Sequence, residues 1–210
     1  MAKRLDGFWV KWGVALIAAL LLSALAARYA YFPGDVEITR FLQSLLPRDL
    51  GWAQVVTNTA RTPWNFALLI LTVVISWLLA GWRAALLAIA SFAVMLTLGP
   101  WMQNLIERSR PSPALAQVTG SSSGYSFPSI FALTYASTFG YLLLLARAQW
   151  SANQANSYGW RRFVTILCLL LLIVGGIARI VLGAHWSSDV LGGYLIGFVW
   201  AALLIRLIRK

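Results

Sequence analysis

A chain of 210 residues that is 60% hydrophobic and only 11% charged carries more apolar surface than a soluble domain of this length can bury. The composition therefore excludes an ordinary soluble domain and indicates a membrane protein. A net charge of +11 would suggest nucleic-acid binding in a soluble protein, but here the basic residues lie between apolar runs and form no basic helix that could enter a groove. We therefore expect the lipid bilayer as a partner, and no nucleic acid.

Six apolar runs are long enough to cross a bilayer as helices, which takes roughly 20 residues each. In chain order they cover residues 13–31, 64–81, 84–102, 128–147, 163–182 and 190–208. The first run follows a basic start, like a signal peptide, but its length favours a retained span. No repeat or linker divides the chain, so we predict one all-α domain over residues 1–210, a polytopic bundle of six transmembrane helices.

Small residues in the last two predicted spans should let those two helices pack closely. They are Gly175, Gly176, Gly192, Gly193 and Gly197. The single cysteine, Cys168, lies inside the fifth run, and one cysteine can form neither an internal disulfide nor a cysteine-based metal cluster. We expect a packed thiol there, and no metal or cofactor.

An even number of spans places both termini on one side of the membrane, and the positive-inside rule identifies that side. The opposite side receives the segments 32–63, 103–127 and 183–189 with five of the six acidic residues. We therefore predict cytoplasmic termini in a bacterial inner membrane, with these segments on the non-cytoplasmic face. The terminal side carries Asp6 and ten basic residues: Lys3, Arg4, Lys11, Arg83, Arg147, Arg161, Arg162, Arg206, Arg209 and Lys210.

The segment 179–189 combines an arginine, the only histidine and a carboxylate near the non-cytoplasmic face. His185 and Asp189 are four residues apart and would share a helix face, so the carboxylate can accept a hydrogen bond from one imidazole nitrogen and leave the other free to attack an electrophile. Arg179 lies at membrane depth, where an arginine is costly without a function or a partner. The alternative is an Arg179–Asp189 pair that only closes the bundle.

Two other segments supply groups suited to an anion. Arg110 precedes Pro111 after the third span, and its planar fork of donors matches phosphate oxygens, although a lone interfacial arginine could simply reach toward water. Ser129 directly precedes the fourth span, where helix N-terminal N–H groups favour an anion. Taken alone, Ser129 could equally be an ordinary N-cap.

Together these segments resemble, in order and spacing, the type 2 phosphatidic acid phosphatase superfamily of membrane lipid phosphatases. The third family motif, Ser-Arg, five residues, His, three residues, Asp, aligns with residues 178–189, with Ala178 in place of the serine. The first motif, Lys, six residues, Arg-Pro, aligns with residues 103–111, where Gln103 stands in place of the lysine. The second motif, Pro-Ser-Gly-His, aligns with residues 128–131, where isoleucine and phenylalanine replace the glycine and the histidine.

The resemblance implies a membrane lipid phosphatase or phosphotransferase. His185 would be the nucleophile that takes the phosphoryl group as a phosphohistidine, with Asp189 orienting it. Phosphate binding would fall to Arg110, Ser129, Arg179 and the position of Gln103, and hydrolysis would need no metal. The substrate would be a lipid phosphate or diphosphate that enters from the outer leaflet.

The departure at Phe131 decides which substrates we expect. The family histidine at this position protonates the departing alkoxide, which phenylalanine cannot do. A diphosphate releases a phosphate that leaves without a proton, so polyprenyl diphosphate is the expected substrate. The alternatives are a non-catalytic member that binds a lipid phosphate or a partner membrane protein, a transporter, and a substitution made to trap a ligand, although Ile130 departs from the motif as well.

Overall fold

Residues 7–46, 49–119, 123–148 and 158–208 are described by a computed structural model, and every regular element within these ranges is helical. The all-α fold class is therefore confirmed. The elements are α1 (Gly7–Ala26), α2 (Asp35–Leu45), α3 (Gly51–Asn58), α4 (Trp64–Ala80), α5 (Trp82–Ile106), α6 (Ile130–Tyr135), the π-helical turn η1 (Ala136–Gly140), α7 (Tyr141–Ala148), α8 (Tyr158–Val181) and α9 (Ser187–Ile208).

The predicted apolar runs correspond to long helices. Five helical stretches of at least 18 residues are apolar enough to cross a bilayer, and α4, with 17 residues, lies just below that length. The first span is shifted relative to the prediction, since α1 covers residues 7–26 rather than 13–31. Its first turns accommodate Trp9, Lys11 and Trp12, whose long amphipathic side chains can reach the membrane interface from inside a helix.

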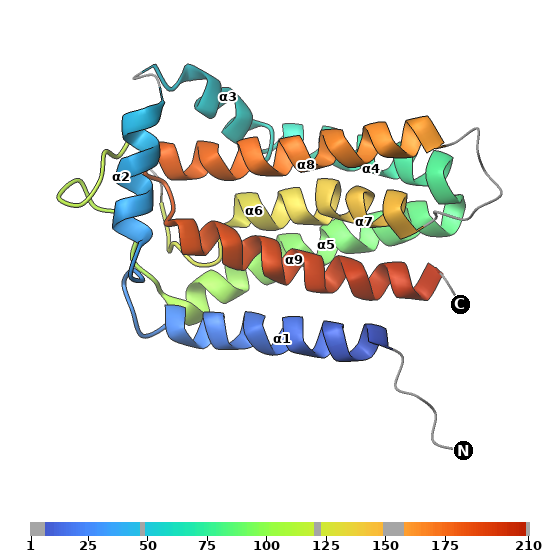
Figure 1. Cartoon of the computed structure of the whole chain (residues 1–210), viewed down its shortest axis with the longest axis horizontal. Helices are drawn as coiled ribbons and strands as arrows, with labels where there is room; N and C mark the ends of the chain where they lie inside the picture. Colours follow the sequence, from blue (N-terminus) through green and yellow to red (C-terminus); the bar gives the residue numbers. More distant parts are fainter. Residues whose placement is uncertain (1–6, 47–48, 120–122, 149–157, 209–210) are drawn as a thin grey trace.

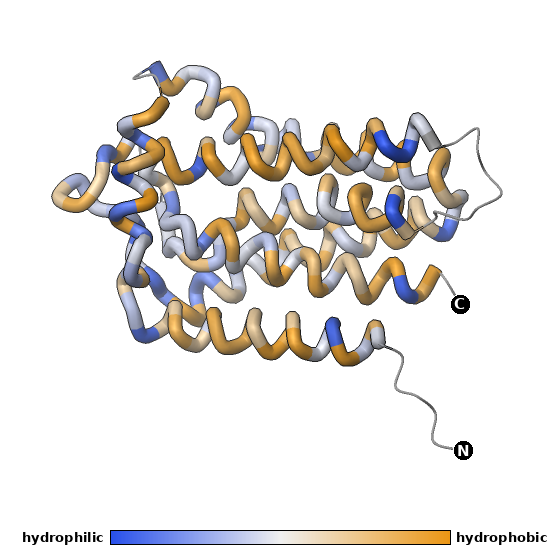
Figure 2. Tube along the Cα trace, viewed as in Figure 1, coloured by the Kyte–Doolittle hydropathy of each residue, from blue (hydrophilic) through white to orange (hydrophobic). Residues whose placement is uncertain are grey.

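The long helices lie side by side, and short helices lie across one end (Figure 1). Helix α1 begins and α9 ends at the same end of the bundle, while α2 and α3 occupy the other. Apolar residues run along the lengths of the helices and polar residues gather toward the ends (Figure 2). The chain is therefore a polytopic membrane bundle with two distinct ends.

The continuous helix from α6 through η1 to α7 is the centre of the bundle. Most of its residues are buried, and it packs against α5, α8 and α9. Close approach to α9 depends on two glycines: a Cβ added at Gly193 would lie 2.8 Å from Ala132 Cβ, and one added at Gly197 would lie 2.3 Å from Ala136 Cβ.

The predicted role of the glycines was therefore largely wrong. Of the five, only Gly176 faces the other helix of the α8–α9 pair, where an added Cβ would meet Val190. Gly175 faces aromatic rings of α6, and Gly192 faces Phe127. The central helix, rather than the α8–α9 contact, needs the small residues, because it is enclosed by neighbours on several sides.

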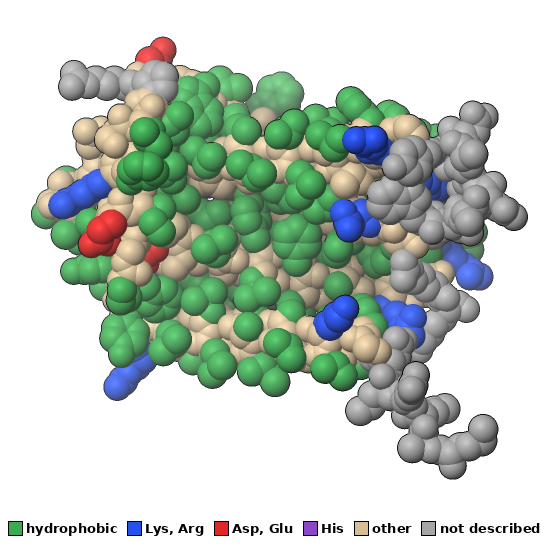
Figure 3. All heavy atoms as spheres, viewed as in Figure 1, with side chains coloured by type: hydrophobic (Ala, Val, Ile, Leu, Met, Phe, Trp, Pro, Cys, Tyr) green, Lys and Arg blue, Asp and Glu red, His purple; other side chains and the backbone are tan. Residues whose placement is uncertain are grey.

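The outer faces of the long helices are apolar. Large side chains such as Val14, Ile70, Leu78 and Leu191 are more than half exposed, and hydrophobic atoms cover the middle of the molecule while blue and red side chains lie toward its ends (Figure 3). So much exposed apolar surface is expected only where lipid covers it. Helices α2 and α3, which the sequence did not predict, lie at one end, where they cover the site described next.

Candidate active site

The chain turns after α5, and this turn places two nearby arginines in different environments, one buried and one partly exposed. Glu107 ends the helix in the left-handed backbone conformation, with φ of 53°, which non-glycine residues rarely adopt. Arg108 then points into the protein and is only 2% exposed, whereas Arg110 is partly exposed and reaches the loop before α9.

Arg108 joins three segments in a buried ionic network. Its Nη1 donates to Asp189 Oδ1 at 2.5 Å and to Ser188 Oγ at 2.8 Å, and its Nη2 lies 3.2 Å from Asp35 Oδ2. Asp35, the first residue of α2, also accepts from Ser188 N at 2.9 Å and from Ser187 Oγ at 2.7 Å. The two carboxylates are buried with their charge compensated, which fixes the beginning of α9.

His185 lies in the turn between α8 and α9 and is 2% exposed. Its Nδ1 lies 2.8 Å from the carbonyl oxygen of Ser126, and its Nε2 lies 3.1 Å from Arg110 Nη1. A guanidinium can only donate, so Nε2 is the unprotonated nitrogen and Nδ1 carries the proton. The arrangement fixes the tautomer in which Nε2 carries the lone pair, which accepts the hydrogen bond from Arg110.

Asp189 stands next to this imidazole but is occupied by other donors. Its Oδ2 lies 3.8 Å from His185 Nδ1, accepts from the backbone N–H of Trp186 at 2.8 Å, and accepts a short hydrogen bond from the Ser126 hydroxyl. The nearest acceptor for the Nδ1 proton is therefore the Ser126 carbonyl, rather than the carboxylate that the i, i+4 spacing predicted. Asp189 acts on the ring through its charge.

Burial lowers the pKa of His185 from 6.5 to about 4, because the imidazolium form loses its hydration. The carboxylate of Asp189 opposes this change, while the positive charges of Arg179 and Arg110 add to it. Burial likewise lowers the pKa of Arg110 below its usual value, and Asp189 partly compensates. His185 is therefore neutral at physiological pH, the state that a nucleophile requires.

A cavity of about 150 Å³ opens beside His185. Arg61, Arg110 and Arg179 line it, together with Gln103 and uncharged residues, and no acidic residue is among the described residues of its wall. Arg179 is 7% exposed, and its Nη1 donates to Thr57 Oγ1 at 3.3 Å. Its Nε has no hydrogen-bond partner among the described residues. A buried guanidinium with an unused donor in a cationic cavity indicates an anionic ligand.

The predicted site residues are not all in the wall of this cavity. Gln103 reaches it, but its side-chain amide donates to the carbonyl of Pro128 at 2.9 Å. Ser129 is fully buried behind the wall, where it is the N-cap of α6 and accepts from Ala132 N at 3.4 Å. Its own N–H donates to the carbonyl of Asp189 at 3.2 Å. The structure thus brings Arg110, Arg179, Gln103 and His185 together, with Ser129 and Asp189 behind them.

Comparisons with known proteins identify the family and the fold. A sequence profile of the PAP2 superfamily matches residues 80–210, which include all three motif segments. The chain belongs to the PAP2 superfamily. Among solved structures it is similar to a PAP2 type phosphatidylglycerolphosphate phosphatase from Bacillus subtilis, with a TM-score of 0.67 and 19% identity over 92% of this chain and 93% of that one. A comparison with curated proteins finds no significant match.

Phe131, which the motif alignment places opposite the histidine of the second family motif, lines the cavity. Its ring lies 5.6 Å from the Arg179 guanidinium carbon and 4.1 Å from the ring of Tyr135, which packs beside it. Tyr125 and Glu107 could have replaced the missing acid, but neither lines the cavity; they form an exposed hydrogen bond of 3.1 Å that raises the pKa of Tyr125. Except for His185 itself, the described wall contains no residue suited to general acid catalysis.

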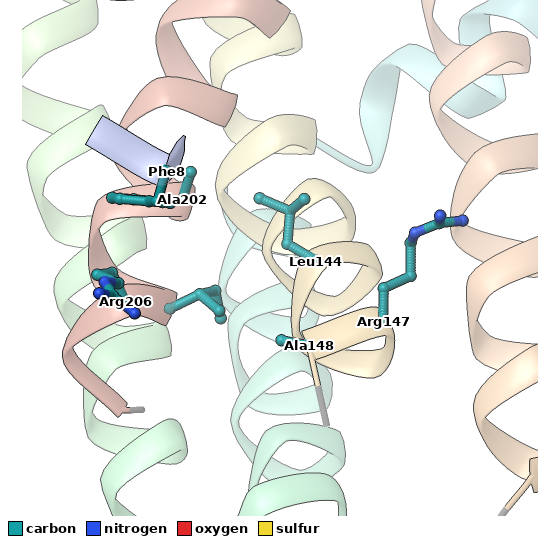
Figure 4. Close-up of a pocket in the computed structure, with 7 residues that line it drawn as sticks. Phe8, Leu144, Arg147, Ala148, Ala202 and Arg206 are labelled. Carbon is teal, nitrogen blue, oxygen red and sulfur yellow. The ribbon is translucent and has the colours of Figure 1, made fainter. Parts of the chain in front are cut away.

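A larger cavity of about 300 Å³ lies at the other end of the bundle, between α7 and α9 (Figure 4). Arg147 and Arg206 lie on opposite sides of it, and Phe8 and Leu144 also line it. Its described wall holds no histidine, serine or cysteine that could act as a nucleophile. The smaller cavity at His185 is therefore the candidate active site.

Sequence reasoning missed three charged residues in and around this site, Arg108, Arg61 and Asp35. Arg108 is one of two arginines separated by a single serine, and only the left-handed turn at Glu107 decides which of them is buried. Arg61 belongs to no family motif and lies between two helices whose positions depend on tertiary packing. A signal existed for Asp35 alone, since an acid at the beginning of a helix is a common N-terminal feature.

Proposed function

We propose that this PAP2 protein is a membrane lipid phosphatase or phosphotransferase that acts on a lipid diphosphate through a phosphohistidine at His185. One observation carries the proposal: a neutral, buried histidine with an unprotonated Nε2 lines a small cavity with three arginines and no described acidic residue in its wall. A phosphoryl group is the anion that both the arginines and the nucleophile suit. Water, or the hydroxyl or phosphate of another lipid, would accept the group in the second step.

The first step forms a bond between Nε2 and phosphorus. In the ligand-free geometry Nε2 accepts a hydrogen bond from Arg110, so an entering phosphate must first take this donor, because one lone pair cannot both accept and attack. Arg110 also donates to the carbonyls of Ala184, Gly124 and Ser123, at 2.7, 3.0 and 3.1 Å. These bonds hold its guanidinium beside the imidazole while the bond forms.

The phosphorylated imidazole carries a positive charge, and two groups accommodate it. The carbonyl of Ser126 accepts the Nδ1 proton throughout, and the Asp189 carboxylate lies 3.8 Å away. Arg108 neutralises part of the carboxylate charge, but it also prevents Asp189 from turning away. In the second step an acceptor oxygen attacks phosphorus, the P–N bond breaks, and its electron pair returns to Nε2.

The absence of a proton donor in the described wall favours diphosphates. General acid catalysis typically contributes a factor of roughly 10² to 10⁴, and an alkoxide leaving group would lose this factor because Phe131 cannot donate. When the terminal phosphorus of a diphosphate is attacked, the bridging oxygen leaves as part of a lipid monophosphate, whose second pKa is about 6, as for a phosphate monoester. It can depart unprotonated. Among membrane lipids, a polyprenyl diphosphate has this chemistry.

We further propose that the site faces the non-cytoplasmic side of a bacterial inner membrane. The five acidic residues of the described part belong to α2, the segment before α3, the C-cap of α5 and the first turn of α9, at the end of the bundle where the site lies (Figure 1). By contrast, the first turns of α1 and α5 and the last turns of α7 and α9, at the other end, carry Lys11, Arg83, Arg147 and Arg206. The positive-inside rule assigns the basic end, and with it both termini, to the cytoplasm.

A turnover panel tests the proposed function. The purified protein in mixed micelles is given matched lipid mono- and diphosphates of the same chain, and phosphate release is measured for the wild type and for His185→Asn, which conserves a polar group of similar size. We expect diphosphate turnover that disappears in the variant. Equal activity of the variant and the wild type would contradict the proposal.

A binding protein without turnover is the second candidate, because Phe131 fills the acid's place with a ring that packs on Tyr135. Binding without turnover would appear as retention of a lipid diphosphate that needs Arg110 and Arg179 while no phosphate is released. That result would replace the enzyme proposal with the binding one.

A further inference from the structure

Arg61 contributes a charge to the candidate site from outside the three family motifs. It lies between α3 and α4 and lines the same cavity as His185. Its backbone is held in place, since its N–H donates to the carbonyl of Asn58 and its own carbonyl accepts from Asn65 N–H, both at 3.0 Å. Its guanidinium, by contrast, makes no hydrogen bond or ion pair with any described residue.

The cavity needs an anion to balance its charge. Three guanidinium groups share a space of about 150 Å³, and the described wall contains no carboxylate. Like charges at such short range repel one another, especially where burial weakens the screening by water. Asp189, the nearest acid behind the wall, is already paired with Arg108. The guanidinium of Arg61 is therefore available to pair with a negative charge on a bound ligand.

The charged groups differ in depth. His185 and Arg179 are 2% and 7% exposed and form the floor, Arg110 is partly exposed, and Arg61 is exposed. Arg61 also adjoins the first turn of α4, where Trp64 is 62% exposed on the outer face of the bundle. A ligand whose terminal phosphoryl group touches the floor would therefore place its next phosphate, and then its lipid chain, near Arg61.

We propose that Arg61 binds the phosphate that remains with the lipid, and so selects diphosphates over monophosphates. This inference rests on the proposed function. In the reaction the bond from Nε2 to the terminal phosphorus forms, the bond from that phosphorus to the bridging oxygen breaks, and the electron pair stays on the departing lipid monophosphate. Arg61 stabilises the negative charge that develops on the departing lipid monophosphate. It also adds a positive charge at the exposed side of the cavity, whereas Gln103, which stands in place of the lysine of the first family motif, is uncharged.

The test compares wild type, Arg61→Gln and Arg61→Lys on farnesyl diphosphate and farnesyl monophosphate. Arg28→Gln is the matched control, because Arg28 is exposed at the same end but does not line the cavity. For Arg61→Gln we expect kcat/KM for the diphosphate to fall about 10- to 100-fold, the effect of one charge-assisted hydrogen bond. The monophosphate value should stay within about threefold, Arg61→Lys should lie between, and Arg28→Gln should match the wild type.

Inhibition by inorganic anions gives a second readout. Pyrophosphate should inhibit wild type more strongly than orthophosphate, and Arg61→Gln should lose this difference. An equal loss for both substrates, or no loss, would overturn the role of Arg61 while leaving the proposed function intact. If the wild type turns over neither substrate, the proposed function fails, and calorimetric binding of pyrophosphate and orthophosphate to the same variants still decides whether Arg61 recognises a second phosphate.

Discussion

His185 should stay neutral far below the pH at which a histidine in water becomes charged. Burial lowers its pKa from 6.5 to about 4, and at about 1.4 kcal/mol for each tenfold change in proton affinity this disfavours the imidazolium by about 3 kcal/mol. The sign of the pH dependence of stability follows from linkage: between pH 6.5 and 4 the histidine binds a proton in the unfolded chain but not in the folded protein. The protein therefore loses stability over that range as pH falls, and this residue has no such effect above it.

The chain offers a direct assay, because His185 is its only histidine. Protein labelled with ¹⁵N-histidine and purified with a tag that contains no histidine shows a single imidazole by NMR. We expect its titration near pH 4 and nitrogen shifts that identify the Nδ1–H tautomer. Arg179→Gln should raise the pKa, since the Arg179 charge contributes to lowering it. A midpoint at or above 6.5, or the Nε2–H tautomer, would refute the reasoning.

Three further predictions concern packing, chemistry and orientation. Arg108→Ala leaves Asp35 and Asp189 buried without their cation, which typically costs about 3–5 kcal/mol; thermal unfolding should show a clear loss beside the exposed control Arg28→Ala, and an unchanged Tm would contradict the network. Phe131→His, alone or with Ile130→Gly, should accelerate monoester hydrolysis by up to roughly 10²-fold or more and diphosphate cleavage far less; equal gains would count against our account of Phe131. In a Cys168→Ala background, an impermeant thiol reagent applied to intact cells should label Ala114→Cys and spare Gly159→Cys, and the reverse pattern would overturn the orientation.

Much of the fold follows from apolar run lengths, because a bilayer leaves a helix few alternatives. The runs predicted over residues 64–81 and 190–208 begin within three residues of the observed α4 and α9. The spacing of His185 and Asp189 brings the two side chains together, but only Asp189 lies in α9, because His185 belongs to the turn before it. Helices α2 and α3 escaped prediction because they are short and only partly apolar. Their positions are set by contacts with α8, which no local pattern records.

The site was predictable where chemistry depends on sequence spacing and not where it depends on a turn. Arg110, Arg179 and His185 meet at one cavity as their motif positions suggest. By contrast, the two carboxylate partners of Arg108 and the position of Arg61 depend on where separate helices begin and end. The same holds for the Ser126 carbonyl, which accepts the hydrogen bond from the imidazole Nδ1. Every residue has a backbone carbonyl, so the residue type at this position could not predict this acceptor.

The most direct test of the central claim is to trap the phosphoryl group on the protein. Wild type is mixed briefly with a lipid diphosphate that carries ³²P in its terminal phosphate, quenched in alkali and digested. We predict an alkali-stable, acid-labile label on the single peptide that contains His185, with no label on His185→Asn. Turnover by the wild type without any labelled histidine, or turnover that survives in His185→Asn, would contradict the account.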